Sequence, residues 1–226
     1  MTAALAILAA GGSTRAGVDK VVAELGGRPV LLWSLAAAEA ASCFDEILVV
    51  APSDKTAAVA KITGTRVRVI AGGATRTASS WAALDATSAD VLAIHDAARP
   101  FVPPSLFARC VEIAREKGSA VAGLPLADTV RRANEAGAAV EEVTREGLWS
   151  AQTPQAFRRE LLLRARERSG DRSFSDDAAA VAAAGLPVQM VMGERRNLKI
   201  TTLEDLGYAR ELVDKGLVAI AALQLR

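Results

Sequence analysis

Short apolar runs alternate with longer stretches of helix-forming residues along most of this chain. The first run, residues 3–10, is almost unbroken, as in a strand that is buried on both faces. Further runs predict strands at 47–51, 67–70, 91–95 and 120–124, with helices between them at 30–41, 53–61, 77–86 and 103–117. This alternation predicts an α/β fold, in which a mostly parallel sheet carries helices on both faces.

The pattern changes between residues 126 and 144. Two short, charged, half-alternating segments, 128–132 and 140–144, flank a turn-forming sequence at 134–137. They predict a β-hairpin arm at about 126–146, with too little apolar surface to be stable alone. The arm therefore either lies on the body as a solvated edge or reaches to another subunit, and the pattern leaves both alternatives open.

The alternation resumes after Trp149. Helices are predicted at 159–168 and 176–184, a strand at 188–191 and a last helix from residue 202. The 226 residues, 51% of them hydrophobic, contain no internal repeat and no linker-like segment. We therefore expect a full hydrophobic core and a single domain over residues 1–226.

Charge and composition exclude several classes of protein. Lys and Arg number 27 against 26 Asp and Glu, and aromatic residues make up 4%, so neither a basic field nor a stacking surface for nucleic acid is expected. No apolar segment is long enough to span a membrane, and the start of the chain lacks the basic region of a signal peptide. Cys43 and Cys110 are isolated, as in reduced thiols. We expect a cytoplasmic protein that binds neither nucleic acid nor membrane.

The first apolar run leads into a loop suited to phosphate. Gly11, Gly12, Ser13 and Thr14 follow the predicted strand, and two cations, Arg15 and Lys20, follow the glycines. Unshielded backbone N–H groups in such a turn bind phosphate oxygens, and nearby cations add positive charge. The alternative is an ordinary surface loop with two solvated cations.

Three polar clusters follow directly on predicted strands, at 11–20, 72–80 and 95–100. Ligands of parallel sheets bind beyond the carboxyl ends of the strands, so we expect the three clusters to form one site. A single histidine and two isolated cysteines argue against Ser-His-Asp or Cys-His hydrolysis and against a His/Cys metal site. The candidate site instead offers one carboxylate and six cations: Asp96, Arg15, Lys20, Arg76, Arg99, Arg145 and Lys199.

So many cations match a substrate with several phosphates. A phosphate monoester is mostly a dianion at neutral pH and needs no general base to act as a nucleophile. Its attack on the α-phosphorus of a nucleotide is therefore compatible with a site poor in histidine. Catalysis would depend on holding two anions together and neutralising charge on the transferred group.

The order of the motifs is more specific than any one of them. They are AAGGSTR at 9–15 with Lys20, GGATR at 72–76 with Ser79, HDAARP at 95–100, Asp128-Thr129, Thr144-Arg145, LWSAQTPQ at 148–155, SDD at 175–177 and NLKIT at 197–201. Over residues 3–210 this order resembles the 2-C-methyl-D-erythritol 4-phosphate cytidylyltransferase family of the non-mevalonate isoprenoid pathway. The resemblance implies a Rossmann-like fold of the nucleotide-diphospho-sugar transferase type.

The resemblance also implies roles for individual residues. Ala10, Gly11, Gly12 and Ser13 would hold the triphosphate of CTP, and Gly73, Ala74 and Ser79 the cytosine. Arg15 and Lys20 would stabilise the pentacoordinate α-phosphate, and Arg145 and Lys199 would position the attacking phosphate. The remaining acceptor contacts would come from Asp96, Arg99, Thr129, Thr153 and Ser175. Mg²⁺ would be held mainly by the CTP phosphates, with no metal site made by protein residues.

The resemblance favours one of the two alternatives for the arm. It implies a homodimer formed by arm exchange, in which Thr129 and Arg145 enter the partner's site. The loop departs from the family pattern at Ser13, where a second glycine is common, and the stretch from Arg15 to Lys20 is short, which affects the reach of Lys20. Ala74 stands where some members carry Asp, so a side-chain contact to the base is missing.

Two other functions remain open at this point. Ribitol 5-phosphate is a similar acceptor, and a difference as small as a methyl branch is worth only about 1–3 kcal/mol in a pocket. A catalytically inactive nucleotide-binding subunit is the other alternative, against which the full set of cations argues. Some residues also have simple structural interpretations: Arg76 as a cation at a helix start, His95 as a packing residue, Trp149 as a core or dimer-contact residue, and Asp176 and Asp177 as first-turn carboxylates.

Overall fold

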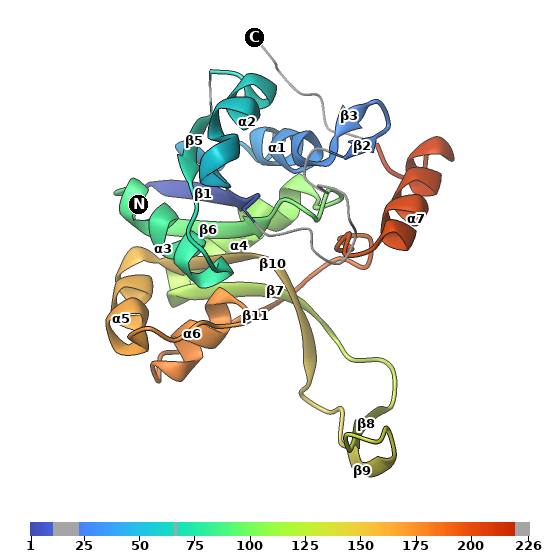
Figure 1. The fold of residues 1–226 in the computed structure, drawn as a ribbon. Coiled ribbons are helices and arrows are strands. Elements are labelled where there is room, and N and C mark those ends of the chain that lie inside the picture. Colours follow the sequence, from blue (N-terminus) through green and yellow to red (C-terminus); the bar gives the residue numbers. More distant parts are fainter. Residues whose placement is uncertain (11–22, 66, 220–226) are drawn as a thin grey trace.

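A computed structural model describes residues 1–10, 23–65 and 67–219. Seven strands form the central sheet in the order β11-β7-β10-β6-β1-β4-β5 (Figure 1). Their bounds, in that order, are Met190–Met192, Ser119–Pro125, Trp149–Arg158, Val91–Asp96, Ala3–Leu8, Glu46–Ala51 and Arg68–Ala71. β10 is antiparallel to both its neighbours, and the other pairings are parallel. The predicted mostly parallel sheet is confirmed.

Helices cover both faces of this sheet because its central strands are apolar on both sides. Leu5 and Ile7 of β1 pack in one cluster with α1 (Val30–Ala41), α2 (Thr56–Thr63) and α4 (Pro104–Lys117). Ala4 and Ala6 of the same strand face a second cluster, with α3 (Arg76–Ala86), α5 (Arg159–Ser169) and α6 (Asp177–Ala183). Alternation of successive side chains between the faces accounts for the nearly unbroken apolar run.

A third apolar cluster lies beyond the sheet. It joins the small β2–β3 hairpin (Glu24–Leu25 and Arg28–Pro29) to the last helix, α7 (Leu203–Asp214), through Trp33 and Phe101. The helix begins at a capping box, in which the Thr202 hydroxyl accepts from the Asp205 backbone N–H and the Asp205 carboxylate accepts from that of Thr202. This arrangement fixes the direction of the chain that leads from the sheet edge into α7.

Two predictions about local structure were wrong or incomplete. The helix predicted at 53–61 begins later: a 3₁₀ turn, η1 (Ser53–Lys55), precedes α2, which begins at Thr56. The ten-residue strand β10 was not predicted, although it lies between β6 and β7 in the sheet. Pro154 and several polar residues interrupt its apolar pattern, and its pairing with β7 shifts register between Ala151 and Gln155.

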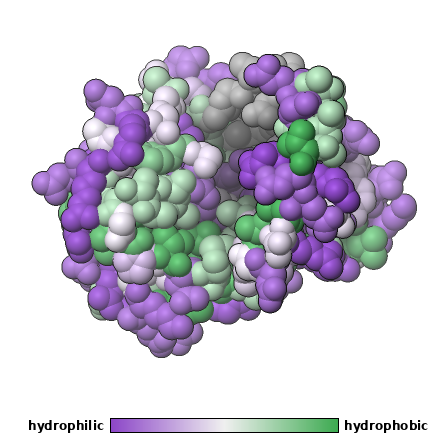
Figure 2. Space-filling model, turned by 90° about the horizontal axis from the view of Figure 1, so that it is seen from below, coloured by the Kyte–Doolittle hydropathy of each residue, from purple (hydrophilic) through white to green (hydrophobic). Residues whose placement is uncertain are grey.

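The predicted hairpin is present and projects from the body below β7 and β10 (Figure 1). Its strands are β8 (Val130–Ala133) and β9 (Ala139–Val143), which pair only with each other in the described part of the chain. Cross-strand ion pairs join Arg131 to Glu142 and Arg132 to Glu141. Seen from the side to which the arm points, hydrophilic residues predominate at the rim and hydrophobic residues gather toward the centre (Figure 2).

Candidate active site

The nucleotide-side positions that the structure describes meet at the carboxyl ends of β1, β4 and β5. A Cβ on Gly72 would lie 2.7 Å from the Ala10 Cβ and 2.8 Å from the Ser79 Oγ, so these three residues are in close approach. The Gly73 backbone N–H donates to the Ser79 hydroxyl over 3.2 Å. Ala74 is exposed beside them. Gly11, Gly12, Ser13, Arg15 and Lys20 lie outside the described residues.

Glycine at position 73 has a steric reason rather than a conformational one. A Cβ there would lie 2.4 Å from the Ala78 Cβ, in the first turn of α3. Thr75 caps this helix, with its hydroxyl accepting from the Ala78 N–H over 3.0 Å. The 72–75 turn is thus pressed against the start of α3, and its residues 73–75 are exposed.

Asp96 is the centre of the acceptor-side positions. It ends β6, and each of its carboxylate oxygens is paired with a cation: Oδ2 with the Lys199 Nζ at 2.7 Å and Oδ1 with the Arg76 Nε at 3.4 Å. Burial opposes ionisation of this carboxyl, but the charges of Arg76 and Lys199 outweigh burial and hold its pKa at about 2. The structure therefore contains a buried carboxylate that stays ionised.

Arg76 has a second carboxylate partner, which the sequence interpretation did not identify. Its Nη1 lies 2.8 Å from an oxygen of Asp177, whose side chain is 2% exposed. Burial lowers the pKa of Arg76, yet the opposing charges of Asp177 and Asp96 raise it above its ordinary value. Arg76 is therefore more than a cation at a helix start, because it bridges the end of β6 and the start of α6.

His95 and Thr153 hold the backbone around Asp96. The Thr153 hydroxyl accepts from the Asp96 N–H over 3.1 Å and lies 3.0 Å from the His95 Nδ1. The other imidazole nitrogen, Nε2, lies 3.2 Å from the Arg99 carbonyl. His95 is fully buried, and this burial lowers its pKa to about 4. These contacts agree with the interpretation of His95 as a packing residue.

Arg99 is placed by the segment that also carries Lys199. Its Nη1 donates to the Asn197 carbonyl over 2.7 Å, and the Asn197 side-chain amide donates to the Thr153 carbonyl over 2.8 Å. Gln152 joins the same segment, since its amide exchanges hydrogen bonds with the Glu194 backbone. These bonds fasten residues 194–199 to β10 and bring Lys199 to Asp96.

The segment with Ser175 is fastened to β10 in a similar way. The Gln155 amide donates to the Asp176 carboxylate over 2.9 Å and accepts from the Ala178 N–H over 3.0 Å. Asp176 also caps α6 by accepting from the Ala179 N–H. Ser175 itself is exposed next to this cap. The prediction of Asp176 as a carboxylate at a helix start agrees with these contacts.

The arm residues are separate from this cluster in the single chain. Thr129 and Arg145 are exposed, and the Arg145 guanidinium donates to the Ala127 carbonyl at the base of the arm. Within the described residues, neither side chain forms a hydrogen bond or ion pair with Asp96, Arg99 or Lys199. The single chain therefore brings together the other described acceptor positions, whereas Thr129 and Arg145 lie on the projecting arm.

Four polar residues with clear positioning contacts were missed as individual candidates: Gln152, Gln155, Asp177 and Asn197. Each is at least 93% buried, and each lies within a quoted motif. Polar residues inside such motifs could have been marked as hydrogen-bonding partners, but their partners come from segments 21 to 101 positions away in sequence. Only the fold reveals those pairings.

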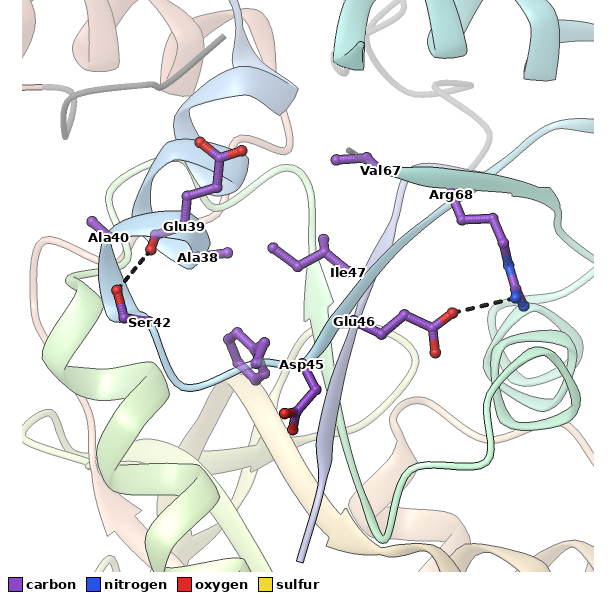
Figure 3. A pocket seen from close by; sticks show the side chains of 10 residues that line it. Ala38, Glu39, Ala40, Ser42, Asp45, Glu46, Ile47, Val67 and Arg68 are labelled. Atoms are coloured by element: carbon purple, nitrogen blue, oxygen red, sulfur yellow. Dashed lines mark hydrogen bonds and ion pairs between the residues drawn. The ribbon is translucent and has the colours of Figure 1, made fainter. Parts of the chain in front are cut away.

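A cavity lies at the other end of the sheet (Figure 3). It has a volume of about 480 Å³ and is lined by the start of β4, the start of β5 and the end of α1. Its visible contacts are structural: the Ser42 hydroxyl donates to the Glu39 carbonyl, and Arg68 pairs with Glu46 at 3.3 Å. Because these are the amino ends of the strands, this cavity is separate from the candidate site.

The described residues contain no group of three or more His, Cys, Asp or Glu side chains that could hold a metal ion. None of the helices among them is sufficiently long and apolar to cross a membrane.

Comparison with known proteins supplies the family. The model of the family described as IspD, 2-C-methyl-D-erythritol 4-phosphate cytidylyltransferase, matches residues 3–215. A protein of that name from Deinococcus radiodurans is 43% identical over 225 residues, which cover 97% of this chain and 94% of the relative. The bifunctional enzyme IspD/IspF of Anaeromyxobacter sp. is 46% identical, with 92% of this chain and 57% of the relative covered. The chain thus spans somewhat more than half the length of that bifunctional relative.

Solved structures agree with these relatives. The 2-C-methyl-D-erythritol 4-phosphate cytidylyltransferase of Thermus thermophilus has a TM-score of 0.81 at 38% identity, covering 95% of this chain and all of that chain. The 4-diphosphocytidyl-2C-methyl-D-erythritol synthase of Anaerococcus prevotii has a TM-score of 0.83 at 26% identity, with 94% and 98% covered. The chain belongs to the 2-C-methyl-D-erythritol 4-phosphate cytidylyltransferase (IspD) family, a family of nucleotidyltransferase enzymes.

Proposed function

We propose that this chain transfers CMP from CTP to 2-C-methyl-D-erythritol 4-phosphate. An oxygen of the acceptor phosphate attacks the α-phosphorus of CTP, and the bond between that phosphorus and the α,β-bridging oxygen breaks. The products are 4-diphosphocytidyl-2-C-methyl-D-erythritol and pyrophosphate. The observation that carries the proposal is the Lys199–Asp96 pair, a cation and a carboxylate that Arg76, the residue after the glycine turn at 72–75, joins through its own ion pair with Asp96.

Asp96 and Lys199 suit the two ends of the acceptor. The ionised carboxylate accepts hydrogen bonds from polyol hydroxyls, whereas the Lys199 ammonium binds the phosphate. The Lys199 side chain is 42% exposed, so it is free to leave Asp96 for a phosphate that binds nearby. Its departure opens one carboxylate oxygen to the hydroxyls of the acceptor.

The transfer needs no general base from the protein. The acceptor phosphate is already largely a dianion at neutral pH, and the pKa of His95 is lowered by burial to about 4, which keeps the imidazole neutral. Arg15 and Lys20, with the loop of Ala10, Gly11, Gly12 and Ser13, are proposed to stabilise charge on the α-phosphate. Mg²⁺, held mainly by the CTP phosphates, would neutralise part of the triphosphate charge.

We further propose that the active form is a homodimer in which the arms are exchanged. Support comes from the projecting hairpin and from the exposed positions of Thr129 and Arg145 on it. Arm exchange would complete each acceptor site with these two residues from the neighbour. The Arg145 guanidinium would join Lys199 on the attacking phosphate.

Pyrophosphate release tests the proposed reaction and separates the two polyol acceptors. The protein is incubated with CTP and Mg²⁺, and either 2-C-methyl-D-erythritol 4-phosphate or ribitol 5-phosphate is added. We expect release with methylerythritol phosphate and a much lower rate with ribitol phosphate. Faster release with ribitol phosphate would assign the alternative acceptor, and no release with either would support the inactive-subunit alternative.

A further inference from the structure

Two cations hold Asp96, and their surroundings differ. Lys199 reaches Oδ2 from an exposed position, with 42% of its side chain accessible. Arg76 reaches Oδ1 and is 23% exposed. In the proposed reaction Lys199 is needed at the acceptor phosphate, so Arg76 is the described cation that stays paired with Asp96 at that stage, and the nearby charge of Arg99 also favours the ionised carboxyl.

Arg76 is held in a way that Lys199 is not. Two of its guanidinium nitrogens face two carboxylates, Nε toward Asp96 and Nη1 toward Asp177 at 2.8 Å. Asp177 is nearly inaccessible, with 2% of its side chain exposed, and lies in the first turn of α6. A planar guanidinium can bridge two carboxylates in fixed geometry, whereas a lysine ammonium is a single point charge.

A second connection keeps these segments together. The Thr77 hydroxyl, next to Arg76 on α3, accepts from the Phe174 N–H over 2.9 Å. The segment that begins at Phe174 leads through Ser175 to Asp177. The start of α3, which carries the proposed cytosine-side residue Ser79, is therefore fastened to the acceptor-side segment at two points.

From this geometry we infer that Arg76, anchored by Asp177, is the positioning residue that keeps the Asp96 carboxylate ionised and oriented when Lys199 moves to the acceptor phosphate. The inference rests on the proposed function. A buried carboxylate without a compensating cation takes up a proton or turns away, and in either case it loses the acceptor hydroxyls. Arg76 and Asp177 thus act on the acceptor through Asp96 rather than by touching it.

The competing interpretation is a direct contact between Arg76 and a substrate phosphate. The third guanidinium nitrogen, Nη2, is buried and has no hydrogen-bond partner among the described residues. A test must therefore separate an effect that passes through Asp96 from an effect on the substrate itself. A double-mutant cycle makes this separation, since residues that act through each other are not additive.

The cycle compares the parent with Arg76→Gln, Asp96→Asn and the double variant. Binding of 2-C-methyl-D-erythritol 4-phosphate is measured by calorimetry with a non-hydrolysable CTP analogue present, so that slow turnover does not hide the effect. Arg76→Gln should raise the Kd for the acceptor by about tenfold or more, since bonds to charged groups are strong. It should add little in the Asp96→Asn background and leave the Kd of the CTP analogue within about twofold, because the loss passes through Asp96 alone.

Asp177→Asn provides a second, nearly isosteric variant, and thermal unfolding establishes that each variant is folded. It should weaken acceptor binding in the parent and add little to Arg76→Gln. Arg166→Gln is the matched control, because it removes an ion pair to Asp85 at the other end of α3, where the carboxylate is 63% exposed. This control should bind the acceptor as the parent does.

Three results would overturn the inference: equal losses from Arg76→Gln in both backgrounds, a comparable loss of nucleotide binding, or parental acceptor binding by Asp177→Asn. Equal losses would show a direct contact between Arg76 and the substrate. The parent is also assayed for pyrophosphate release. If the parent is active and the variants bind the acceptor as the parent does, the inference fails and the proposed function stands. If the parent neither binds nor uses the acceptor, the proposed function fails as well.

Discussion

Lys199 and Asp96 are 103 positions apart in sequence and form a 2.7 Å ion pair at the carboxyl edge of the sheet. The pair joins the end of β6 to the segment that precedes α7. Two hydrogen bonds hold the segment of Lys199 against β10: the Gln152 amide donates to the Glu194 carbonyl, and the Asn197 amide donates to the Thr153 carbonyl. The ion pair thus keeps Lys199 beside the position where the acceptor phosphate is proposed to bind.

Replacing Lys199 should affect the acceptor far more than the nucleotide. Lys199→Gln removes a preorganised charge from the attacking phosphate, and we expect kcat/KM for methylerythritol phosphate to fall by about 10²-fold. The KM for CTP should change little. Lys215→Gln is the matched control, because its ion pair with Glu211 is exposed at the C-terminal end of α7. Equal effects on both substrates would contradict the assignment of Lys199 to the acceptor side.

A methyl group at position 73 should disturb the nucleotide side. The Cβ of Gly73→Ala would meet the Ala78 Cβ at 2.4 Å, so the turn or the start of α3 must shift. We expect the KM for CTP to rise by about tenfold or more, since overpacking shifts backbone at a cost of about 1–3 kcal/mol. Steady-state kinetics at saturating acceptor measures this change.

Gly207→Ala is the corresponding control within α7. A Cβ at Gly207 meets nothing within 4 Å, and its backbone is helical. This variant should gain up to about 1 kcal/mol in the free energy of unfolding, because alanine favours a helix over glycine. A parental KM for CTP in Gly73→Ala would show that the turn adapts and that its shape is unimportant for the nucleotide.

The fully buried His95 should make the protein less stable as the pH falls from 7 to 5. Burial lowers its pKa in the folded state to about 4, against about 6.5 when unfolded, so the unfolded chain binds the extra proton in this window. Stability is therefore full above about pH 6.5 and declines toward pH 4. Linkage gives a loss of about 2 kcal/mol between pH 7 and pH 5.

Chemical denaturation of the parent and of His95→Gln at both pH values measures this loss. His95 is the only histidine of the sequence, so the variant removes the one side chain with an ordinary pKa near 6.5. Its stability should depend much less on pH in this range, whatever its absolute value. The same decline in both proteins would mean that the pKa of His95 is no lower in the folded state than in the unfolded chain.

The strands of the sheet were readable from the sequence where both faces are apolar, as in β1, β4, β6 and β7. β10 was not, because Pro154 and the polar residues Gln152 and Gln155 interrupt its pattern. Those same amides fasten the segments of Lys199 and Ser175 to the sheet. The polar residues that obscured β10 in the sequence therefore also position the segments of the candidate site.

The convergence of the site residues was predictable from the sequence, but their pairing was not. That polar clusters after parallel strands converge follows from topology, and the Arg76–Asp96 ion pair joins the two clusters that the structure describes. The partner of a buried charge does not follow from topology. Asp177 resembled an ordinary helix-start carboxylate, and only the fold, in which Gln155 of β10 holds the start of α6, brings it to Arg76.

Subunit mixing tests the exchange of arms. Arg145→Ala and Lys20→Ala chains should each be nearly inactive, since loss of one electrostatic partner of a transition state costs about 10²–10³ in kcat. If arms are exchanged, one site of the heterodimer contains both substitutions. The other site contains an unchanged Lys20 and an unchanged Arg145. Activity should then return on mixing. No recovery, although heterodimers form, would place Arg145 in the site of its own chain.

Phosphorus NMR of the reaction with CTP, Mg²⁺ and 2-C-methyl-D-erythritol 4-phosphate tests the central claim most directly, because it shows which bond has broken. We expect the signals of CTP and of the acceptor monoester to decline together. Two coupled resonances of a diphosphate diester and the single resonance of pyrophosphate should replace them in equal amounts. Formation of CDP with inorganic phosphate, or consumption of CTP while the acceptor monoester persists, would contradict the transfer of CMP.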